Sequence, residues 1–241
     1  MLHKFIFSCF ISSLLLVSQN LLAQTFQSST AKTQLLELYS SQGCSSCPPA
    51  ERWISKQIHN PDLWNTFIPV VFHVDYWDYL GWKDPFSNKQ YSARQRKYHY
   101  QGGISSVYTP GVILNGREWR GWYRNHSLPI SEIKPGQLKA TLKDEILKIH
   151  FEHAQPMNVN IALLGFNIKT NIKNGENRGK TFTEDFIVLD KINMFSKEAS
   201  WVIDISSMQI NSGQRYALAV WINKPDKLQP LQATGGWIQN Q

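Results

Sequence analysis

Hydrophobic and polar positions in the first half of the chain alternate between the period of strands and the period of helices. The patterns run in the order strand, helix, strand, helix and hairpin, at residues 33–39, 48–58, 68–74, 88–100 and 111–122. The third pattern is almost continuously apolar, as expected for a central parallel strand that is buried on both faces. Asn115-Gly116 separates two short apolar segments and predicts a tight turn between paired strands.

The second half of the chain reads almost entirely as strands. Apolar segments separated by polar turns occur at residues 138–142, 146–151, 159–166, 185–189, 200–205 and 215–222. This spacing predicts an antiparallel, immunoglobulin-like β-sandwich. We therefore expect an α/β domain at residues 24–134, followed by an all-β sandwich domain at residues 135–241.

The first 23 residues have the pattern of a secretory signal peptide. His3 and Lys4 supply a positive start, an apolar stretch follows at residues 5–17, and the small residue Ala23 ends the segment. The apolar stretch is short for a membrane-spanning helix, and a retained anchor helix is the alternative interpretation. We expect a secreted, periplasmic protein with no stable membrane span after cleavage.

The 241-residue chain carries a formal net charge of +7, and its basic residues are scattered. One local cluster, Arg94, Arg96 and Lys97, falls in the predicted helix 88–100, where we expect a solvated face. No nucleic-acid-binding motif accompanies this charge, so nucleic acid is not an expected partner. The charge indicates solubility and a preference for acidic partners or surfaces.

The motif Cys44-Ser45-Ser46-Cys47 lies between a strand pattern and a helix pattern. Because Cys9 falls in the predicted signal peptide, Cys44 and Cys47 are the only cysteines expected in the mature chain. This spacing is typical of thiol–disulfide chemistry, and a helix N-terminus favours a thiolate. A structural disulfide and a metal clip are the alternatives, although a zinc site usually brings a second Cys/His pair.

The order of strand, C-x-x-C, helix, central strand and Thr109-Pro110 before a hairpin resembles the thioredoxin superfamily. This resemblance implies a thioredoxin-like domain at residues 24–134 with an aromatic insertion at 76–106. It also implies a cis peptide bond at Pro110, opposite the cysteines. More narrowly, the chain resembles the DUF1223 family of secreted bacterial proteins, in residues 37–50, 72–86, 107–110, 175–177 and 235–236.

By this resemblance and by position, Cys44 is predicted to be the attacking sulfur, exposed at the N-cap of the helix. Cys47 would then be the resolving thiol, one turn further in. Gly43 and the prolines at 48 and 49 depart from the pattern of thioredoxin itself, which argues against a general reductase.

Three further residues are candidates for acid–base chemistry near the thiols. His73 and Asp75 are two apart at the end of the central strand and would share one face, as a base or proton shuttle. Alternatively, His73 joins Cys44 and Cys47 as a copper or zinc ligand, or packs in the core while Asp75 caps a turn. Glu37 is predicted to be a buried proton relay, with a surface strand residue as the alternative.

The aromatic insertion supplies candidate substrate-binding residues. Tyr76, Trp77 and Trp82 could anchor a partner, together with the backbone of Thr109, or could simply pack over the sheet.

Together these features predict a thiol–disulfide oxidoreductase that acts on a protein or small-thiol partner. Its redox-active group would be the Cys44–Cys47 pair, with no other cofactor. The competing hypotheses are a copper- or zinc-binding or chaperone-like module, and a partner-binding scaffold without catalytic activity.

Overall fold

The structure is a computed structural model that describes residues 23–124, 126–210 and 213–239. The predicted signal peptide lies outside these residues, apart from Ala23. Two α-helices, α1 and α2, span Pro48–Ser55 and Lys89–Tyr100. Three 3-10 helices span Lys56–His59, Asp78–Leu80 and Gly121–Arg124.

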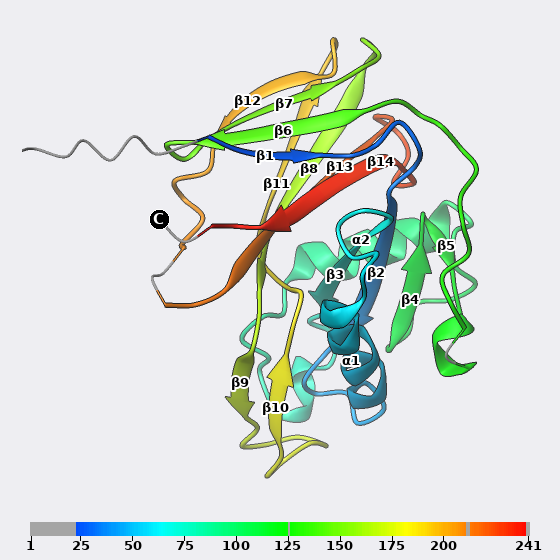
Figure 1. Ribbon diagram of the computed structural model, residues 1–241. Coiled ribbons are helices and arrows are strands. Elements are labelled where there is room, and N and C mark those ends of the chain that lie inside the picture. Colours follow the sequence, from blue (N-terminus) through cyan, green and yellow to red (C-terminus); the bar gives the residue numbers. More distant parts are fainter. Residues whose placement is uncertain (1–22, 125, 211–212, 240–241) are drawn as a thin grey trace, which may run out of the picture.

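An eight-stranded mixed sheet runs through the molecule in the order β14-β13-β8-β11-β3-β2-β4-β5 (Figure 1). In that order its strands are Pro230–Trp237, Tyr216–Asn223, Met157–Gly165, Ile187–Ser196, Phe67–His73, Gln34–Ser40, Gly111–Leu114 and Arg117–Glu118. Strands β2 and β3 are parallel, whereas β4 runs antiparallel to β2.

Two smaller antiparallel sheets complete the fold. The four-stranded sheet β1-β6-β7-β12 consists of Gln24–Gln27, Leu138–Lys143, Ile146–Phe151 and Ser200–Asp204. The hairpin of β9 and β10 consists of Ile168–Asn171 and Thr181–Glu184. It extends past the end of the large sheet, beside α1 (Figure 1).

The predicted fold class, a thioredoxin-like α/β domain followed by an immunoglobulin-like sandwich, is wrong. Strand β11 from the second half pairs in parallel with β3 from the first, where Val71 N–H donates to Phe186 O at 2.9 Å. Strand β1, at the start of the described chain, pairs with β6. Both sheets are therefore shared between the two halves, because the backbone groups along β3 and β6 find their partners across the predicted boundary. How the chain divides into folding units stays a prediction.

Several local elements are confirmed. The predicted strands and helices at 33–39, 48–58, 68–74 and 88–100 correspond to β2, α1 with its 3-10 extension, β3 and α2. The hairpin of β4 and β5 turns at Asn115 and Gly116, which have φ of 50° and 83°. Such values are typical of the tight turns that Asn-Gly favours. Strands β1, β9, β10 and β14 were not predicted, because their apolar patterns are short or interrupted.

Two hydrophobic cores share the central strands. In β8, Val159, Ile161 and Leu163 pack into the core between the eight-stranded and the four-stranded sheet, while Ala162 and Leu164 pack into the core around β2 and β3. Alternate side chains of one strand point to opposite faces, so β8 contributes to both cores. Strand β13 alternates in the same way, with Ala219 in one core and Val220 in the other, so both strands connect the two cores.

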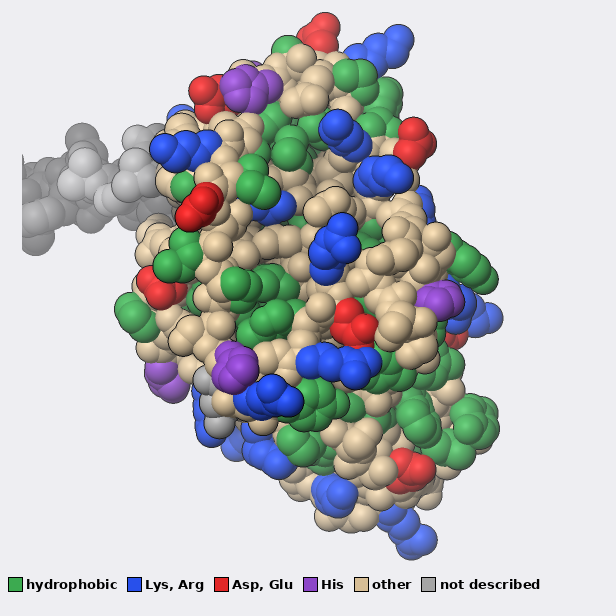
Figure 2. Space-filling model, turned by 90° about the vertical axis from the view of Figure 1, so that its right-hand side faces the viewer, with side chains coloured by type: hydrophobic (Ala, Val, Ile, Leu, Met, Phe, Trp, Pro, Cys, Tyr) green, Lys and Arg blue, Asp and Glu red, His purple; other side chains and the backbone are tan. Residues whose placement is uncertain are grey.

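The surface agrees with the scattered charge of the sequence. On the face shown in Figure 2, Lys and Arg side chains lie among hydrophobic and polar ones without forming one continuous patch. Arg94 is an exception to the predicted solvated face of α2, because it is 7% exposed and lies in the interior. Among the described residues, no helix is long and apolar enough to cross a membrane.

Candidate functional site

The cysteine loop, residues 41–47, joins the end of β2 to the start of α1. Cys44 and Cys47 form a disulfide in this loop. Both cysteines are 0% exposed, whereas Ser45 and Ser46 between them face solvent. The prediction of an exposed Cys44 is therefore wrong, because the loop presents its two serines instead of its sulfurs.

The start of α1 also differs from the prediction. Its N-cap is Cys47, not Cys44, and prolines occupy the first two helical positions. Proline has no backbone N–H. The first turn therefore offers fewer amide donors to a thiolate than an ordinary helix N-terminus does.

The turn between β9 and β10 covers the cysteine loop. Asn177, which is buried, donates from Nδ2 to Gln42 O at 2.9 Å and to Cys44 O at 3.0 Å. The exposed Glu176 accepts a hydrogen bond from Ser45 N–H at 3.1 Å. A segment more than 130 residues away in the sequence thus holds the backbone around Cys44. The sequence placed residues 175–177 within the family resemblance but did not predict that they contact the cysteine loop.

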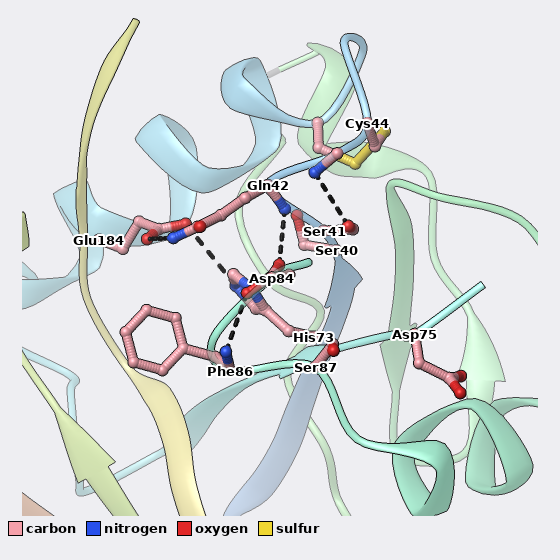
Figure 3. A network of polar contacts seen from close by, with 12 residues as sticks. Ser40, Ser41, Gln42, Cys44, His73, Asp75, Asp84, Phe86, Ser87 and Glu184 are labelled. Atoms are coloured by element: carbon pink, nitrogen blue, oxygen red, sulfur yellow. Dashed lines mark hydrogen bonds and ion pairs between the residues drawn. A yellow bond between two sulfur atoms is a disulfide. The ribbon is translucent and has the colours of Figure 1, made fainter. Parts of the chain in front are cut away.

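Asp84 connects the cysteine loop to the end of the central strand β3 (Figure 3). Its Oδ2 accepts the backbone N–H of Gln42 at 2.7 Å and lies 2.7 Å from His73 Nδ1. Its Oδ1 accepts the N–H of Phe86 at 2.9 Å. Asp84 is 1% exposed and His73 is 0% exposed, so this link is wholly internal.

The other ring nitrogen of His73 faces two glutamates. His73 Nε2 lies 3.8 Å from Glu184 Oε1, and neither atom has a hydrogen-bond partner in the structure. Glu184 Oε2 accepts from Gln42 Nε2 at 2.6 Å, and Glu51 Oε1 accepts the hydroxyl of Ser40. We refer to His73, Asp84, Glu184 and Glu51 as the His73 cluster. It lies directly beneath the cysteine loop (Figure 3).

Burial and mutual charge alter the proton affinities in the His73 cluster. Burial by itself would lower the pKa of His73, but the neighbouring carboxylates, Asp84 first, outweigh it and raise that pKa to about 10. Burial raises the pKa of Glu184 to about 8 and also raises the pKa of Glu51. Burial opposes ionisation of Asp84 too, but the charge of His73 prevails and lowers its pKa. The cluster therefore binds protons more tightly at His73, Glu184 and Glu51 than free side chains do.

Asp75 does not share a site with His73. Strand β3 ends at His73, so the alternation that would place both residues on one face stops there. Asp75 points away from His73 (Figure 3) and accepts the hydroxyl of Ser92 on α2.

Glu37 is buried, as predicted for a relay, but all its oxygens are occupied. Arg94 donates to it from Nε at 2.8 Å and from Nη2 at 3.1 Å. The hydroxyls of Tyr39 and Tyr98 also donate to it. We refer to these four residues as the Glu37 cluster. Glu37 and Ser40 are three apart in β2, so the Glu37 cluster and the His73 cluster lie on opposite faces of the sheet.

The predicted substrate-binding aromatics are half-buried around the cysteine loop. Trp82 donates from Nε1 to Gln42 Oε1 at 3.1 Å, and Trp77 donates from Nε1 to Thr109 Oγ1 at 2.7 Å. Tyr76 donates to Gln95 Oε1 at 3.0 Å. The polar atoms of all three rings therefore bind within the protein.

The structure also locates the Thr109–Pro110 peptide bond and the candidate metal ligands. The Thr109–Pro110 peptide bond is cis, as the resemblance implied. It precedes Gly111, which pairs with Tyr39 of β2. Ligand atoms of His73, Glu51 and Glu184 lie within 4.8 Å of one another. The cysteines of the alternative copper or zinc set are joined to each other in a disulfide.

Sequence reasoning missed Glu51, Glu184, Gln42 and Asn177 as parts of the site. Glu51 is one of the buried residues of α1 and is 6% exposed. Glu184 ends the alternating strand Thr181–Glu184, whose buried positions are Phe182 and Glu184. That alternation was the available signal, since it places a carboxylate where an apolar residue is expected.

The fold and site define a class: a mixed β-sheet protein with a disulfide loop above a buried histidine–carboxylate cluster. The chain belongs to the family described as Protein of unknown function (DUF1223), which matches residues 35–223. No curated protein matches the chain.

Two solved structures are similar in fold. One is the crystal structure of a protein from Agrobacterium tumefaciens, with a TM-score of 0.62 and 23% identity, covering 86% of this chain and 94% of that one. The other is HBP35 of Porphyromonas gingivalis, with a TM-score of 0.53 and 14% identity, covering 87% of this chain and 76% of that one.

Proposed function

We propose that this protein exchanges thiols and disulfides with a protein or small-thiol partner through Cys44 and Cys47. The observation that carries the proposal is the pairing of these two cysteines, three residues apart, in a loop between β2 and α1. A pair this close in sequence closes only a short loop, so it contributes little to stability through chain entropy. Reactivity is the better explanation of the motif.

The exchange is a two-electron step with two sulfur displacements. The Cys44 thiolate attacks a partner disulfide, forms a mixed disulfide and releases one partner thiolate. The Cys47 thiolate then attacks the Cys44 sulfur, releases the second partner thiolate and closes the Cys44–Cys47 bond. The dithiol is oxidised and the partner disulfide is reduced; the reverse sequence oxidises a partner dithiol.

Access to the sulfurs requires the loop to move, because both cysteines are buried. The exposed bond from Ser45 N–H to Glu176 is the weakest restraint, since solvent competes for both groups. The buried bonds from Asn177 to the backbone of Gln42 and Cys44 hold the other side. We propose that the loop opens at Ser45 and Ser46.

The thioredoxin-like resemblance supports this proposal only for the part of the chain that carries the cysteines. That segment is β2, the cysteine loop, α1 and β3. The expected secreted, periplasmic location fits the proposal, because a disulfide persists in an oxidising compartment. The cysteine pair is the redox-active group, and no other cofactor is required. Of the three acid–base candidates, we assign His73 a positioning role, through Asp84 and Gln42.

Trapping with single cysteine variants tests the proposal. Cys47→Ser should accumulate a covalent mixed disulfide with a model disulfide partner, because the resolving thiol is missing. Cys44→Ser should neither trap a partner nor turn over. Glu132→Gln, at an exposed position outside the cysteine loop, is the folded control that should behave as wild type. Equal exchange by Cys44→Ser and wild type would overturn the proposal.

The reduction potential of the pair tests the same proposal without a variant. Equilibration in glutathione buffers, read by alkylation and mass shift, should give a potential above about −300 mV. A value above about −200 mV would indicate a disulfide donor, and one near −270 mV a reductant. A pair that resists reduction below about −300 mV is a structural disulfide, and the exchange proposal would then fail.

A further inference from the structure

Two buried polar atoms of the His73 cluster have no hydrogen-bond partner among its own residues. His73 Nε2 and Glu184 Oε1 are both buried and both lack a hydrogen-bond partner. Buried nitrogen and oxygen atoms of this kind are almost always paired, because an unpaired one costs about 1–3 kcal/mol. Two such atoms facing each other across one small space therefore indicate something that binds between them.

The spacing of these atoms fits a metal ion better than a direct hydrogen bond. Their separation of 3.8 Å is too long for a hydrogen bond. Two ligands at about 2.0 Å from a tetrahedral Zn²⁺ lie roughly 3.3 Å apart, so a shift of a few tenths of an ångström brings both into range. A carboxylate oxygen of Glu51 completes a group in which all three ligand atoms lie within 4.8 Å of one another.

The surroundings of His73 are those of a metal-binding histidine. Its other nitrogen, Nδ1, is held by Asp84 at 2.7 Å, and Asp84 is fixed by the backbone N–H groups of Gln42 and Phe86. A carboxylate bound to the far side of a ligating imidazole is the usual means of fixing its tautomer and orientation. Nε2 is thereby directed at the two glutamates.

The acidic side chains around His73 also favour the binding of a cation. Three carboxylates, on Glu51, Asp84 and Glu184, surround a single imidazole in the interior. Among the described residues no Lys or Arg forms an ion pair with any of them. A divalent cation bound between these groups takes the place of the protons that the buried carboxyl groups otherwise hold.

We propose that Glu51, His73 and Glu184 bind a divalent transition-metal ion, with Zn²⁺ as the preferred ion and Asp84 as the outer support of His73. Imidazole and carboxylate ligands suit Zn²⁺. The cysteines are not ligands in this site. The proposal does not depend on thiol–disulfide exchange, and either can fail without the other.

The first test is zinc content after refolding, because a buried site is filled as the chain folds. The purified protein is unfolded with a chelator and refolded with Zn²⁺, and metal is measured by mass spectrometry after desalting. We expect one Zn²⁺ per chain in wild type, and the same in the double variant Cys44→Ser/Cys47→Ser. The proposal would be overturned if the wild type bound no stoichiometric zinc. It would also be overturned if the wild type bound zinc and the double cysteine variant did not, because the cysteines would then be ligands.

The second test compares matched variants in competition with a chromophoric chelator. Glu184→Gln and Glu51→Gln keep the shape of the side chain and remove its charge, and each should bind Zn²⁺ at least tenfold more weakly. Glu132→Gln, at an exposed position, should bind as wild type does. Equal affinity in all three variants would contradict the assignment.

The absorption spectrum of bound cobalt(II) tests the ligand set in the wild-type protein, so this experiment does not depend on the folding of a variant. Bound Co²⁺ should show ligand-field absorption without a sulfur-to-cobalt charge-transfer band. A charge-transfer band would instead place the metal on the cysteines and overturn the proposed ligand set.

Discussion

The two buried charged clusters of this protein lie on opposite faces of the same pair of strands, yet they differ in how completely they are satisfied. In the Glu37 cluster, one carboxylate receives hydrogen bonds from Arg94, Tyr39 and Tyr98. In the His73 cluster, a ring nitrogen and a carboxylate oxygen remain unpartnered. We call the Glu37 cluster closed, because both carboxylate oxygens of Glu37 have hydrogen-bond partners. We call the His73 cluster open, because two of its polar atoms have none.

This difference indicates that the Glu37 cluster is a structural ion pair and that the His73 cluster is a candidate site. Arg94 also packs over the rings of Phe72, Tyr98 and Trp221, so its charge is enclosed by the core. The His73 cluster instead reaches the cysteine loop through Asp84 and Gln42. A closed cluster resists change, whereas an open one retains groups that a ligand can bind.

The largest effect is expected where the closed cluster is broken. Glu37→Gln leaves the guanidinium of Arg94 buried without its counter-charge, and losing one partner of a buried pair costs about 3–5 kcal/mol. Urea denaturation should show this loss in the free energy of unfolding. The exposed control Glu132→Gln should change it by no more than about 0.5 kcal/mol. A similarly small change in Glu37→Gln would mean that the cluster is not closed in solution.

Removing the link between the open cluster and the cysteine loop should have the next largest effect. Asp84→Ala strands the N–H groups of Gln42 and Phe86 and removes the ion pair of His73, which together should cost roughly 2–4 kcal/mol. The disulfide should also be reduced faster by dithiothreitol, because the loop loses its anchor. Lys83→Ala, an exposed change nearby, is the control. An unchanged reduction rate in Asp84→Ala would show that the loop does not depend on this link.

The closed cluster should also impose a pH dependence. Burial, followed by the charge of Arg94, lowers the pKa of Lys191 to about 7. Lys97 and Lys227 line the same pocket and add no negative charge. At Lys191 the unfolded chain binds more protons than the folded one between about pH 7 and 10, so the contribution of this residue to stability should rise with pH. The contribution of His73, whose pKa is raised to about 10, should fall over the same range.

The rise should amount to about 1–2 kcal/mol once solvent screening is allowed for. Unfolding in urea at pH 7.5 and pH 9.5 measures it. The free energy of unfolding of the wild type, taken relative to that of Lys191→Met, should increase by this amount from pH 7.5 to pH 9.5, because both proteins share the contribution of His73. An equal change between the two pH values in wild type and Lys191→Met would contradict the assignment.

The smallest effect on stability is expected from the same Glu→Gln change in the open cluster. In metal-free protein, Glu184→Gln can keep the bond from Gln42, and Oε1 has no partner to lose. The free energy of unfolding should change by less than about 1 kcal/mol. Side-by-side denaturation of Glu184→Gln and Glu37→Gln measures the contrast directly. Equal losses in the two variants would remove the distinction between the clusters.

Local structure was largely predictable from the sequence, because it depends on neighbouring residues. The apolar run of β3, the Asn115-Gly116 turn and the prolines that open α1 all act over a few positions. The site was only partly predictable. His73 was found, but its partner is Asp84 and not Asp75, because β3 ends at His73 and the chain turns away.

The sequence by itself determined the positions of the central strands and helices, the close spacing of Cys44 and Cys47, and the membership of the chain in its family. Only the tertiary structure decided that β11 completes the sheet beside β3 and that Glu51 and Glu184 meet at His73. The physical reason is the sequence separation over which each interaction acts. Strand and turn preferences act between neighbours, whereas Glu184 lies 111 positions after His73. Residues that far apart come together only when the backbone groups of distant strands pair.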